Sequence, residues 1–268
     1  MASVTVQKIT KFIEEHIPEF HQKRLESLTK LKLKKVLRRK NPYLYKAKFV
    51  TNAPDLVKAI LDAHLSSQEE AIFGSFLEKL AISICENVFS GKKSIAEGID
   101  LEFERDDIRY VVSIKSGPNW GNSGQIKKMR QNFLQAKRIL RTNMSSKNIV
   151  AVNGCCYGQE SVEDRGDYLK KCGQSFWSFI SGADDFYLTI IEPLGHKAKE
   201  RNELFHIEYG KVINRFTAEF IKEFCQTDGT ILWKKLVQFN SALKNKFPPV
   251  GRPADCCIPR AKGAKNPA

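Results

Sequence analysis

The sequence runs through Gly98-Ile99-Asp100-Leu101-Glu102-Phe103 and, after the polar turn Glu104-Arg105-Asp106-Asp107, through Tyr110-Val111-Val112-Ser113-Ile114-Lys115-Ser116-Gly117. Both apolar segments carry charged residues where a buried strand should have none, and together they predict a β-hairpin. Because side chains alternate along a strand, Asp100 and Glu102 share one face, and Ser113 and Lys115 share one face of the next strand. The hairpin is expected to bring these faces together at the edge of a sheet.

An acid and a lysine at a sheet edge are the groups needed to hydrolyse a phosphodiester. Carboxylates can hold Mg²⁺, and the lysine can meet a phosphate or an attacking water. The alternative is a merely solvated face, which is common on paired strands. Two features favour catalysis: the second strand is apolar enough to be central, and it runs into a Gly-rich loop at residues 116–124. Such a loop lets the backbone approach a ligand closely.

Composition indicates the class of partner. The chain has 268 residues, of which 42% are hydrophobic, enough for one domain or for one core with a helical appendage. A net charge of +14 points to a polyanion, with nucleic acid as the first candidate and an anionic membrane surface as the competing one. No apolar run approaches 18 residues and the N-terminus lacks a signal-peptide core, so we expect a soluble, unexported protein without a membrane span. The seven cysteines lack C-x₂-C spacing, which favours reduced thiols over a zinc site.

The N-terminal third is predicted to be helical. Apolar spacing predicts helices over residues 3–20, interrupted by Pro18, over 22–40 and over 55–65. The helix of residues 22–40 is strongly basic, which is compatible with phosphate contact or with a solvated face. Ser66 or Ser67 is then expected to cap a longer helix, with Glu69 or Glu70 closing a capping box.

This longer helix carries two acids on one face, Glu70 and Glu78, with Gly74 between them. Glu70 can be explained as a capping residue and Glu78 as a surface charge. Glu78 receives more weight because it lies among Phe76, Leu77 and Leu80, where an isolated carboxylate is costly.

A βαβ unit is predicted after the hairpin, from a helix over residues 124–141 and a strand over 148–154. Residues 176–179 are expected to form a core cluster, and 186–191 a last strand or the start of a helix. Residues 196–224 and 230–246 are predicted helices. The predicted organisation is a basic helical region (1–65), a nuclease core (66–195), C-terminal helices (196–246) and a disordered tail (247–268).

The order of these features resembles the PD-(D/E)XK nuclease superfamily. More narrowly, it is similar to type II restriction endonucleases that cut interrupted GC-rich palindromes of the GGNCC type. The similarity extends from residues 25–42 into the C-terminal helices and is strongest at four places: Phe73-Gly74, Asp100, Ser113-Ile114-Lys115-Ser116-Gly117 and Phe176-Trp177-Ser178-Phe179.

The resemblance implies an α/β fold, with a central mixed sheet flanked by helices and with helical additions at both ends. It also implies a homodimer on double-stranded DNA, in which two symmetry-related sites cut the two strands of a palindrome. A prokaryotic cytoplasmic location and a cognate DNA methyltransferase are further expectations from the family.

The site implied by the resemblance departs from the family pattern at two positions. Ile99 replaces the usual proline, and Ser113 occupies the usual acidic position two residues before Lys115. A hydroxyl is a poorer Mg²⁺ ligand than a carboxylate, so a second carboxylate is needed. Glu78 is the preferred donor, with Glu70 and Glu102 as alternatives. The Ile114 carbonyl can also coordinate the metal.

The expected mechanism assigns Mg²⁺ to Asp100, Glu78 and the Ile114 carbonyl, and assigns Lys115 to the attacking water and the phosphate, leaving a 5′-phosphate as in the family. DNA contacts are expected from the basic helices and the Gly-rich loop, at Lys34, Lys35, Arg38, Arg39, Asn119, Asn122, Gln125, Lys127 and Lys128. Two alternatives to a restriction endonuclease remain at this point: a repair or recombination nuclease, and a non-enzymatic nucleic-acid-binding protein.

Overall fold

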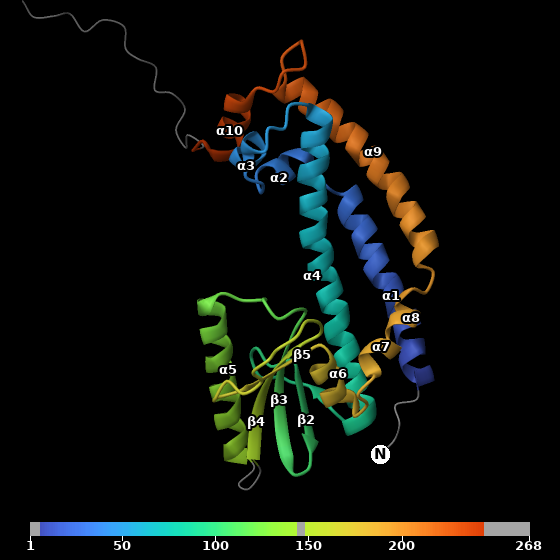
Figure 1. Cartoon of the computed structure of the whole chain (residues 1–268), viewed down its shortest axis with the longest axis vertical. Helices are drawn as coiled ribbons and strands as arrows, with labels where there is room; N and C mark the ends of the chain where they lie inside the picture. The colour runs from blue at the N-terminus through green and yellow to red at the C-terminus, as the bar shows by residue number, and fades with distance from the viewer. Residues whose placement is uncertain (1–5, 144–147, 244–268) are drawn as a thin grey trace, which may run out of the picture.

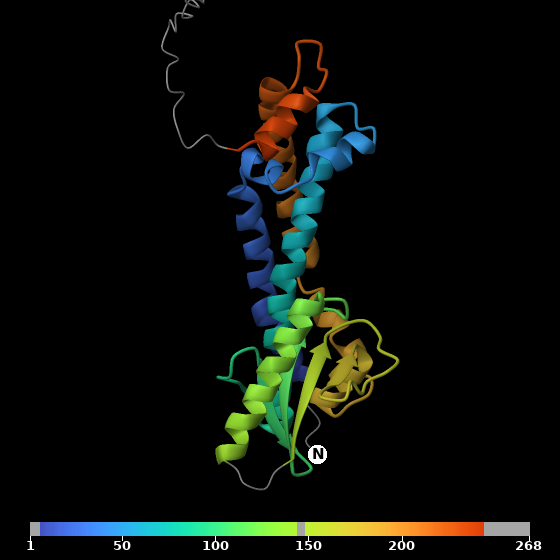
Figure 2. The same ribbon diagram turned by 90° about the vertical axis from the view of Figure 1, so that its left-hand side faces the viewer.

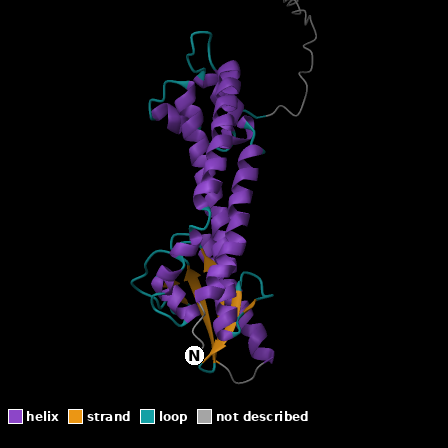
Figure 3. Cartoon of the chain, turned by 90° about the vertical axis from the view of Figure 1, so that its right-hand side faces the viewer, coloured by secondary structure: helices purple, strands orange, loops and turns teal. Residues whose placement is uncertain are grey.

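The computed structural model describes residues 6–143 and 148–243. A small sheet lies at one end of an elongated molecule, and long helices extend from it to a group of short helices at the other end (Figure 1). All strands are confined to the sheet end, as the colouring by secondary structure in Figure 3 makes clear. The tail of residues 247–268, for which disorder is predicted, lies outside the described residues.

The sheet has five strands in the order β1 (Lys92–Lys93), β2 (Leu101–Arg105), β3 (Ile108–Lys115), β4 (Asn148–Cys155) and β5 (Leu169–Cys172). The first three strands are antiparallel, whereas β3, β4 and β5 are parallel. The predicted mixed α/β fold is therefore confirmed. The short strands β1 and β5 were not predicted, because neither segment has a clear apolar alternation.

The predicted hairpin is formed by β2 and β3, with Leu101 opposite Val112. Its turn is shorter than the expected four residues, 104–107, because Arg105 already pairs with Ile108 and only Asp106 and Asp107 lie between them. Asp106 and Asp107 make the turn with φ values of 52° and 57°. Positive φ at both central positions is typical of the two-residue hairpin turns that match strand twist, and Asp tolerates it better than most residues.

Helix α5 (Ser123–Asn143) connects β3 to the parallel strand β4, so the predicted βαβ unit is confirmed. It covers one face of the sheet (Figure 2). On this face Met129 and Phe133 pack on Val111 and Ala151. The other face is covered by the C-terminal end of α4 (Ala53–Phe89) and by α6 (Gln174–Ser181). The expected core cluster lies in α6, where Phe176, Trp177 and Phe179 are buried.

Helix α4 is continuous over 37 residues, so the predicted break at Ser66–Ser67 is wrong. The Ser67 hydroxyl instead donates to the Ala63 carbonyl, 3.1 Å away and one turn earlier. A serine can satisfy its hydroxyl inside a helix in this way, and neither serine interrupts the backbone bonds. The actual start is Asn52, whose side chain accepts from the Asp55 amide, with Pro54 in the first turn.

The N-terminal helices also differ from the prediction. Helix α1 (Val6–Thr29) continues through Pro18, and the single helix expected over residues 22–40 is replaced by the end of α1 and the short helix α2 (Leu33–Leu37). Burial of Ile13 and Ile17 against the sheet end holds α1 together across Pro18, although proline removes one backbone bond. Helix α3 (Pro42–Ala47) begins at Asn41, which caps the Tyr43 amide.

The remaining segments are helical. The ambiguous segment 186–191 forms α7 (Phe186–Thr189) and the start of α8 (Ile191–Leu194). Helix α9 (Ala198–Phe224) agrees with the prediction, and α10 (Trp233–Ser241) is shorter than residues 230–246.

The buried side chains of the molecule fall into two regions, one at each end. We call the first the sheet lobe: it comprises the sheet, the C-terminal half of α4, and α5 to α8. We call the second the helical lobe: it comprises α2, α3, α10, and the parts of α4 and α9 that pack on them through Leu56, Leu61, Phe216 and Phe220.

Candidate active site

Asp100 lies immediately before β2 and is placed there by a glycine turn. Gly98 has φ = 72°, and a Cβ at this position would lie 2.0 Å from the amide nitrogen of the Asn132 side chain. Only glycine fits this position, since a side chain would meet both backbone strain and a clash. The Asp100 amide then donates to the Val112 carbonyl (2.8 Å), which fixes the aspartate beside β3.

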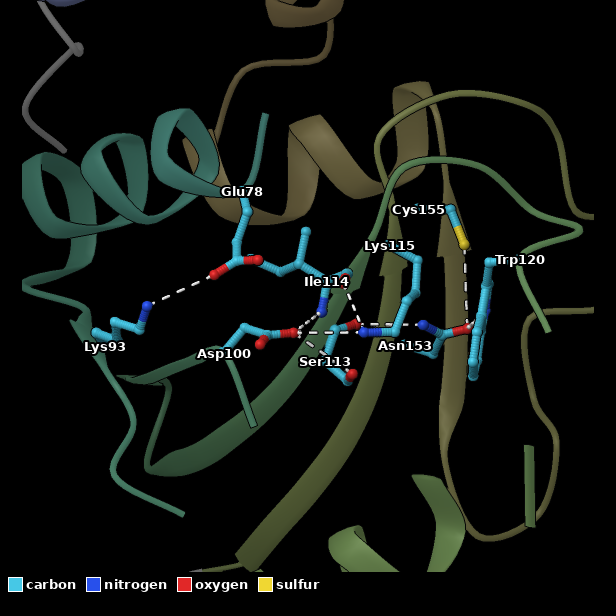
Figure 4. A network of polar contacts seen from close by, with 9 residues as sticks. All are labelled: Glu78, Lys93, Asp100, Ser113, Ile114, Lys115, Trp120, Asn153 and Cys155. Atoms are coloured by element: carbon cyan, nitrogen blue, oxygen red, sulfur yellow. Dashed lines mark hydrogen bonds and ion pairs between the residues drawn. The ribbon is translucent and has the colours of Figure 1, made fainter. Parts of the chain in front are cut away.

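The hairpin brings Asp100 and Lys115 together, as the alternation of side chains predicts (Figure 4). One carboxylate oxygen, Oδ2, accepts from the Ile114 amide (2.6 Å) and lies 3.5 Å from the Ser113 hydroxyl and 3.7 Å from Lys115 Nζ. The other oxygen, Oδ1, makes no hydrogen bond or ion pair with the residues that the structure describes. One oxygen is thus anchored to the protein, while the other keeps its lone pairs for a ligand.

Lys115 is held at the end of β3 by neighbours of three kinds. Its Nζ donates to the Ile114 carbonyl (2.9 Å), faces the Asp100 carboxylate, and lies 5.4 Å from the centre of the Trp120 ring. The side chain is 30% exposed, so the ammonium group is partly desolvated but remains accessible from outside. These contacts define where a phosphate or a water would meet the ammonium.

Glu78 enters the same region from α4, with its carboxylate directed toward Ile114 and Lys93 in Figure 4. It lies 3.7 Å from Lys93 Nζ, and its side chain is 32% exposed. The Glu78 carboxylate is close enough to affect the Cys156 thiol. Burial raises the pKa of Cys156 to about 12, and the negative charge of Glu78 contributes to the increase. Glu70, two turns earlier on α4, is exposed.

Glu102 has a structural partner. It is buried and lies 2.6 Å from Arg109 on β3, and Ser94 also donates to it. Burial alone would raise the pKa of this carboxyl, but the bonds from Arg109 and Ser94 outweigh it and lower the pKa. A carboxylate already paired with a guanidinium is a poor donor to a metal, so Glu102 is the weaker alternative to Glu78.

The donor set beside Asp100 is sparse. Within residues 6–143 and 148–243, no group of three or more His, Cys, Asp or Glu is placed to hold a metal. Mg²⁺ usually takes one or two protein carboxylates and completes its six ligands with water and substrate phosphate. Asp100 Oδ1, the Ile114 carbonyl and Glu78 fit this requirement, whereas a structural zinc site would need four protein ligands.

Two of the loop residues predicted to contact DNA stabilise the start of α5. The Asn122 side chain accepts from the Gln125 amide (3.0 Å), and the Gln125 side chain accepts from the Asn122 amide (2.9 Å). This is a reciprocal capping box, which sequence spacing could have identified. Asn119 and Lys127 are exposed nearby, and Lys128 pairs with Glu97 at 2.9 Å.

The other predicted DNA contacts lie in the helical lobe, far from Asp100. Lys35 and Arg39 are exposed there, while Lys34 pairs with Glu223 (2.9 Å) and Arg38 stacks over Phe239. The helical lobe packs on α4 between Leu56 and Leu65, which is 13 to 22 residues from Glu78. At 1.5 Å per residue, the separation along α4 is about 20–33 Å.

Sequence reasoning missed Asn153 and Trp120. Asn153 lies in β4 opposite Ser113, is 1% exposed, and accepts from the Trp120 indole N–H (3.1 Å). Its amide group also donates to the Ser113 carbonyl (3.2 Å). The sequence does hint at Asn153, because it is a polar residue in the apolar segment Ala151-Val152-Asn153. A buried side-chain amide nearly always has hydrogen-bond partners, so its position indicates a polar contact inside the fold.

A mixed sheet that brings an aspartate and a lysine together at the end of a central strand is the architecture of a PD-(D/E)XK-type nuclease. The family model described as "Type II restriction endonuclease EcoO109I" matches residues 7–202, almost three quarters of the sequence. The chain therefore belongs to the EcoO109I-type family of type II restriction endonucleases. No curated protein matches the chain.

Family membership fixes the class of activity. The protein is a hydrolase, a site-specific deoxyribonuclease with DNA as its substrate, which decides against the repair nuclease and the non-enzymatic binding protein. No helix among the described residues is long and apolar enough to cross a membrane.

Proposed function

We propose that this enzyme hydrolyses both strands of duplex DNA at one palindromic GC-rich site in a Mg²⁺-dependent reaction. The observation that carries the proposal is the Asp100–Lys115 pair, 3.7 Å apart at the end of the central strand β3. One Asp100 oxygen has no partner among the residues that the structure describes, and Lys115 is partly exposed. An anionic ligand site and a cation side by side match the needs of phosphodiester hydrolysis.

Three groups of the chain are proposed to hold the metal: the Asp100 carboxylate, the Glu78 carboxylate and the Ile114 carbonyl. When bound, Mg²⁺ supplies Lewis-acid activation of water and neutralises charge on the phosphate. The bond from the Ile114 amide to Oδ2 keeps Asp100 in one orientation, which leaves Oδ1 as the proposed metal ligand. Glu78 supplies the carboxylate that Ser113 lacks, and the Ser113 hydroxyl, 3.5 Å from Asp100, helps to orient the aspartate.

Lys115 has the transition-state role. Its ammonium group orients the attacking water and stabilises the additional negative charge on the phosphate as the new P–O bond forms. The bond between phosphorus and the 3′ oxygen breaks, the 3′ oxygen takes a proton, and the phosphate stays on the 5′ end of the downstream fragment of the same strand. No histidine occurs between residues 65 and 195. A general base drawn from this stretch would therefore be a carboxylate or a lysine such as Lys115, and not an imidazole.

The proposal extends to the assembly. Two copies of the chain related by a twofold axis would present two such sites to the two strands of a palindrome. Phosphate contacts are assigned to Asn119, Lys127 and Lys128 near the site, with Asn122 and Gln125 holding the loop in place, and to Lys34, Lys35, Arg38 and Arg39 in the helical lobe. A cognate DNA methyltransferase would protect the host sequence.

Digestion of a sequenced plasmid with and without Mg²⁺ tests this function. We expect discrete fragments with 5′-phosphate ends that share one palindromic sequence, and no cutting in the presence of a chelator. Smeared products, or discrete cutting that persists in the chelator, would contradict the proposal. Asp107→Asn is a matched control for Asp100→Asn, because Asp107 is exposed in the hairpin turn and asparagine accepts its positive φ.

A further inference from the structure

A polar network lies behind Lys115 and links three segments of the sheet lobe. It begins at the Ser113 carbonyl on β3, passes through the Asn153 amide on β4, and ends at the indole N–H of Trp120 in the loop after β3 (Figure 4). Cys155 Sγ, 4.0 Å from the Asn153 oxygen, is a weaker member. The buried amide of Asn153 thus fixes the Trp120 ring relative to the strand that carries Lys115.

The Trp120 ring faces the end of the Lys115 side chain, with Nζ 5.4 Å from the ring centre. An ammonium group within about 6 Å of an indole face is attracted by the negative potential of the ring. Lysine has a flexible four-carbon stem with many rotamers, so a fixed wall on one side restricts where its charge can lie. On its other side, Lys115 meets the Ile114 carbonyl and the Asp100 carboxylate.

We propose that Trp120, anchored by Asn153, is a positioning residue that holds the Lys115 ammonium against the Asp100 site. The inference rests on the proposed function of Lys115 and adds two residues that the PD-(D/E)XK pattern does not contain. Trp120 acts through Lys115 and touches no reacting atom. Its role is to keep the ammonium in the orientation that the transition state requires, and a displacement of a catalytic group by about 1 Å can cost about 10²-fold in rate.

Simple core packing does not explain this arrangement as well. Trp120 is only partly buried and packs at the margin of the cluster formed by Met129 and Phe133. A ring used only as apolar filler would not need a hydrogen bond to an asparagine that is 1% exposed. A buried amide that binds both the strand and the indole is instead suited to hold the ring in one orientation.

Two substitutions of Trp120 separate the contribution of its aromatic face from that of its hydrogen bond to Asn153. Trp120→Phe keeps an aromatic face but removes the N–H that binds Asn153, whereas Trp120→Leu removes the face as well. We expect Trp120→Leu to lower the single-turnover cleavage rate by about tenfold and Trp120→Phe by about threefold, with enzyme saturating and Mg²⁺ present. The affinity for the same DNA, measured without Mg²⁺, should change by less than about twofold.

A double-mutant cycle with Lys115→Met shows whether the effect passes through the lysine. When the ammonium is absent, Trp120→Leu should produce no further loss of rate. Trp233→Leu is the matched control, because Lys46 lies 5.5 Å from the Trp233 ring in the helical lobe, and it should cleave at the wild-type rate. If Trp120→Leu does not fold, Trp120→Met makes the same comparison with a longer, unbranched and more adaptable side chain.

Two results would overturn the inference while leaving the proposed function intact. The first is an equal relative loss from Trp120→Leu in the presence and absence of the Lys115 ammonium, which would make Trp120 a packing residue. The second is weaker DNA affinity with an unchanged saturating rate, which would make it a DNA contact. Wild-type cleavage by Lys115→Met would instead overturn the role of Lys115 itself, and the inference with it.

Discussion

The two lobes differ in what they bury. Six polar or charged residues are buried among the described residues, and five of them lie in the sheet lobe: Glu102, Ser113, Asn132, Asn153 and Ser181. The sixth, His64, lies on the part of α4 that carries the helical lobe, whose interior is otherwise formed by apolar side chains. Buried polar groups usually have hydrogen-bond partners that fix their orientation, which supports placing the proposed chemistry in the sheet lobe.

The lobes also differ in charge. Residues 30–52, which form α2, α3 and their connections, contain nine Lys or Arg and no Asp or Glu. The sheet lobe instead mixes both signs, with pairs such as Glu102–Arg109 and Glu160–Lys170. We infer that the helical lobe contributes mainly electrostatic attraction to DNA, and the sheet lobe contributes bond cleavage.

Salt should have the largest effect, because both lobes contribute cations to DNA binding. If roughly 6–10 phosphates are contacted, the affinity should fall by about 10³–10⁵ between about 50 and 200 mM salt. Fluorescence anisotropy with a labelled duplex in the absence of Mg²⁺ measures this directly. An affinity that is nearly independent of salt would mean that the basic surfaces of both lobes face away from DNA.

Removing the charged pair of the sheet lobe should abolish cleavage without abolishing binding. Asp100→Asn keeps an acceptor for the Ile114 amide but loses the charge, and Lys115→Met removes the ammonium group. Each should lower the single-turnover rate by at least about 10²-fold while the affinity stays within a few-fold. Asp107→Asn serves as the control. Near wild-type cutting by either site variant would remove the Asp100–Lys115 pair from the mechanism.

The second carboxylate can be identified by a Mg²⁺ titration of three variants. Glu78→Gln should need more Mg²⁺ and cut at least roughly tenfold more slowly, whereas Glu70→Gln should remain close to wild type because Glu70 is exposed. Glu102→Gln should instead lower the unfolding temperature, since it removes the negative charge from the 2.6 Å pair that buried Glu102 forms with Arg109. A larger rate loss for Glu70→Gln than for Glu78→Gln would transfer the assignment to Glu70.

The contribution of the helical lobe should depend on duplex length. The helical lobe, which carries Lys35 and Arg39, packs on α4 about 20–33 Å along the helix from Glu78, so these residues would reach phosphates roughly 6–10 base pairs from the cut, at 3.4 Å per step. Lengthening the flanks of the recognition site should therefore tighten binding several-fold, and Lys35→Ala with Arg39→Ala should remove that gain and reduce the salt slope by about two. Single-turnover cleavage at saturation should be unchanged. Equal loss on short and long duplexes would place these residues at the recognition site.

The two lobes were not equally predictable from sequence. The hairpin, α5 and β4 follow from strong alternation and helical periodicity, and Asp100 and Lys115 are apparent because they interrupt apolar strands. Helix boundaries were predicted poorly in the N-terminal region, where Pro18 and the Ser66–Ser67 pair looked like ends but are accommodated inside α1 and α4. The packing of both helices against other elements overrides these local signals. The link from Asn153 to Trp120 joins residues 33 apart in sequence, which only the tertiary fold reveals.

The smallest expected effect concerns acid pH and again separates the lobes. His64 is buried, and its pKa is lowered, first by desolvation and then by Lys40, Arg39 and Lys35. Because the folded-state pKa lies below the usual value of 6.5, the unfolded chain binds the proton more readily. Stability should therefore fall as the pH is lowered from above 6.5 toward the folded-state pKa.

Urea unfolding at pH 7.5 and 5.5 measures this loss. His64→Gln should reduce the difference between the two urea midpoints, because glutamine has no proton to gain, whereas the exposed control His206→Gln should retain it. His21, on α1, has a pKa lowered by desolvation, Arg201 and Arg24, and contributes in the same direction, so the His64 variant should lose only part of the effect. No histidine lies between residues 65 and 195, so acid should weaken the helical contacts before the hairpin that holds Asp100 and Lys115. Hydrogen exchange that rises first in β2 and β3 would reverse that order and make the sheet lobe the more acid-sensitive of the two.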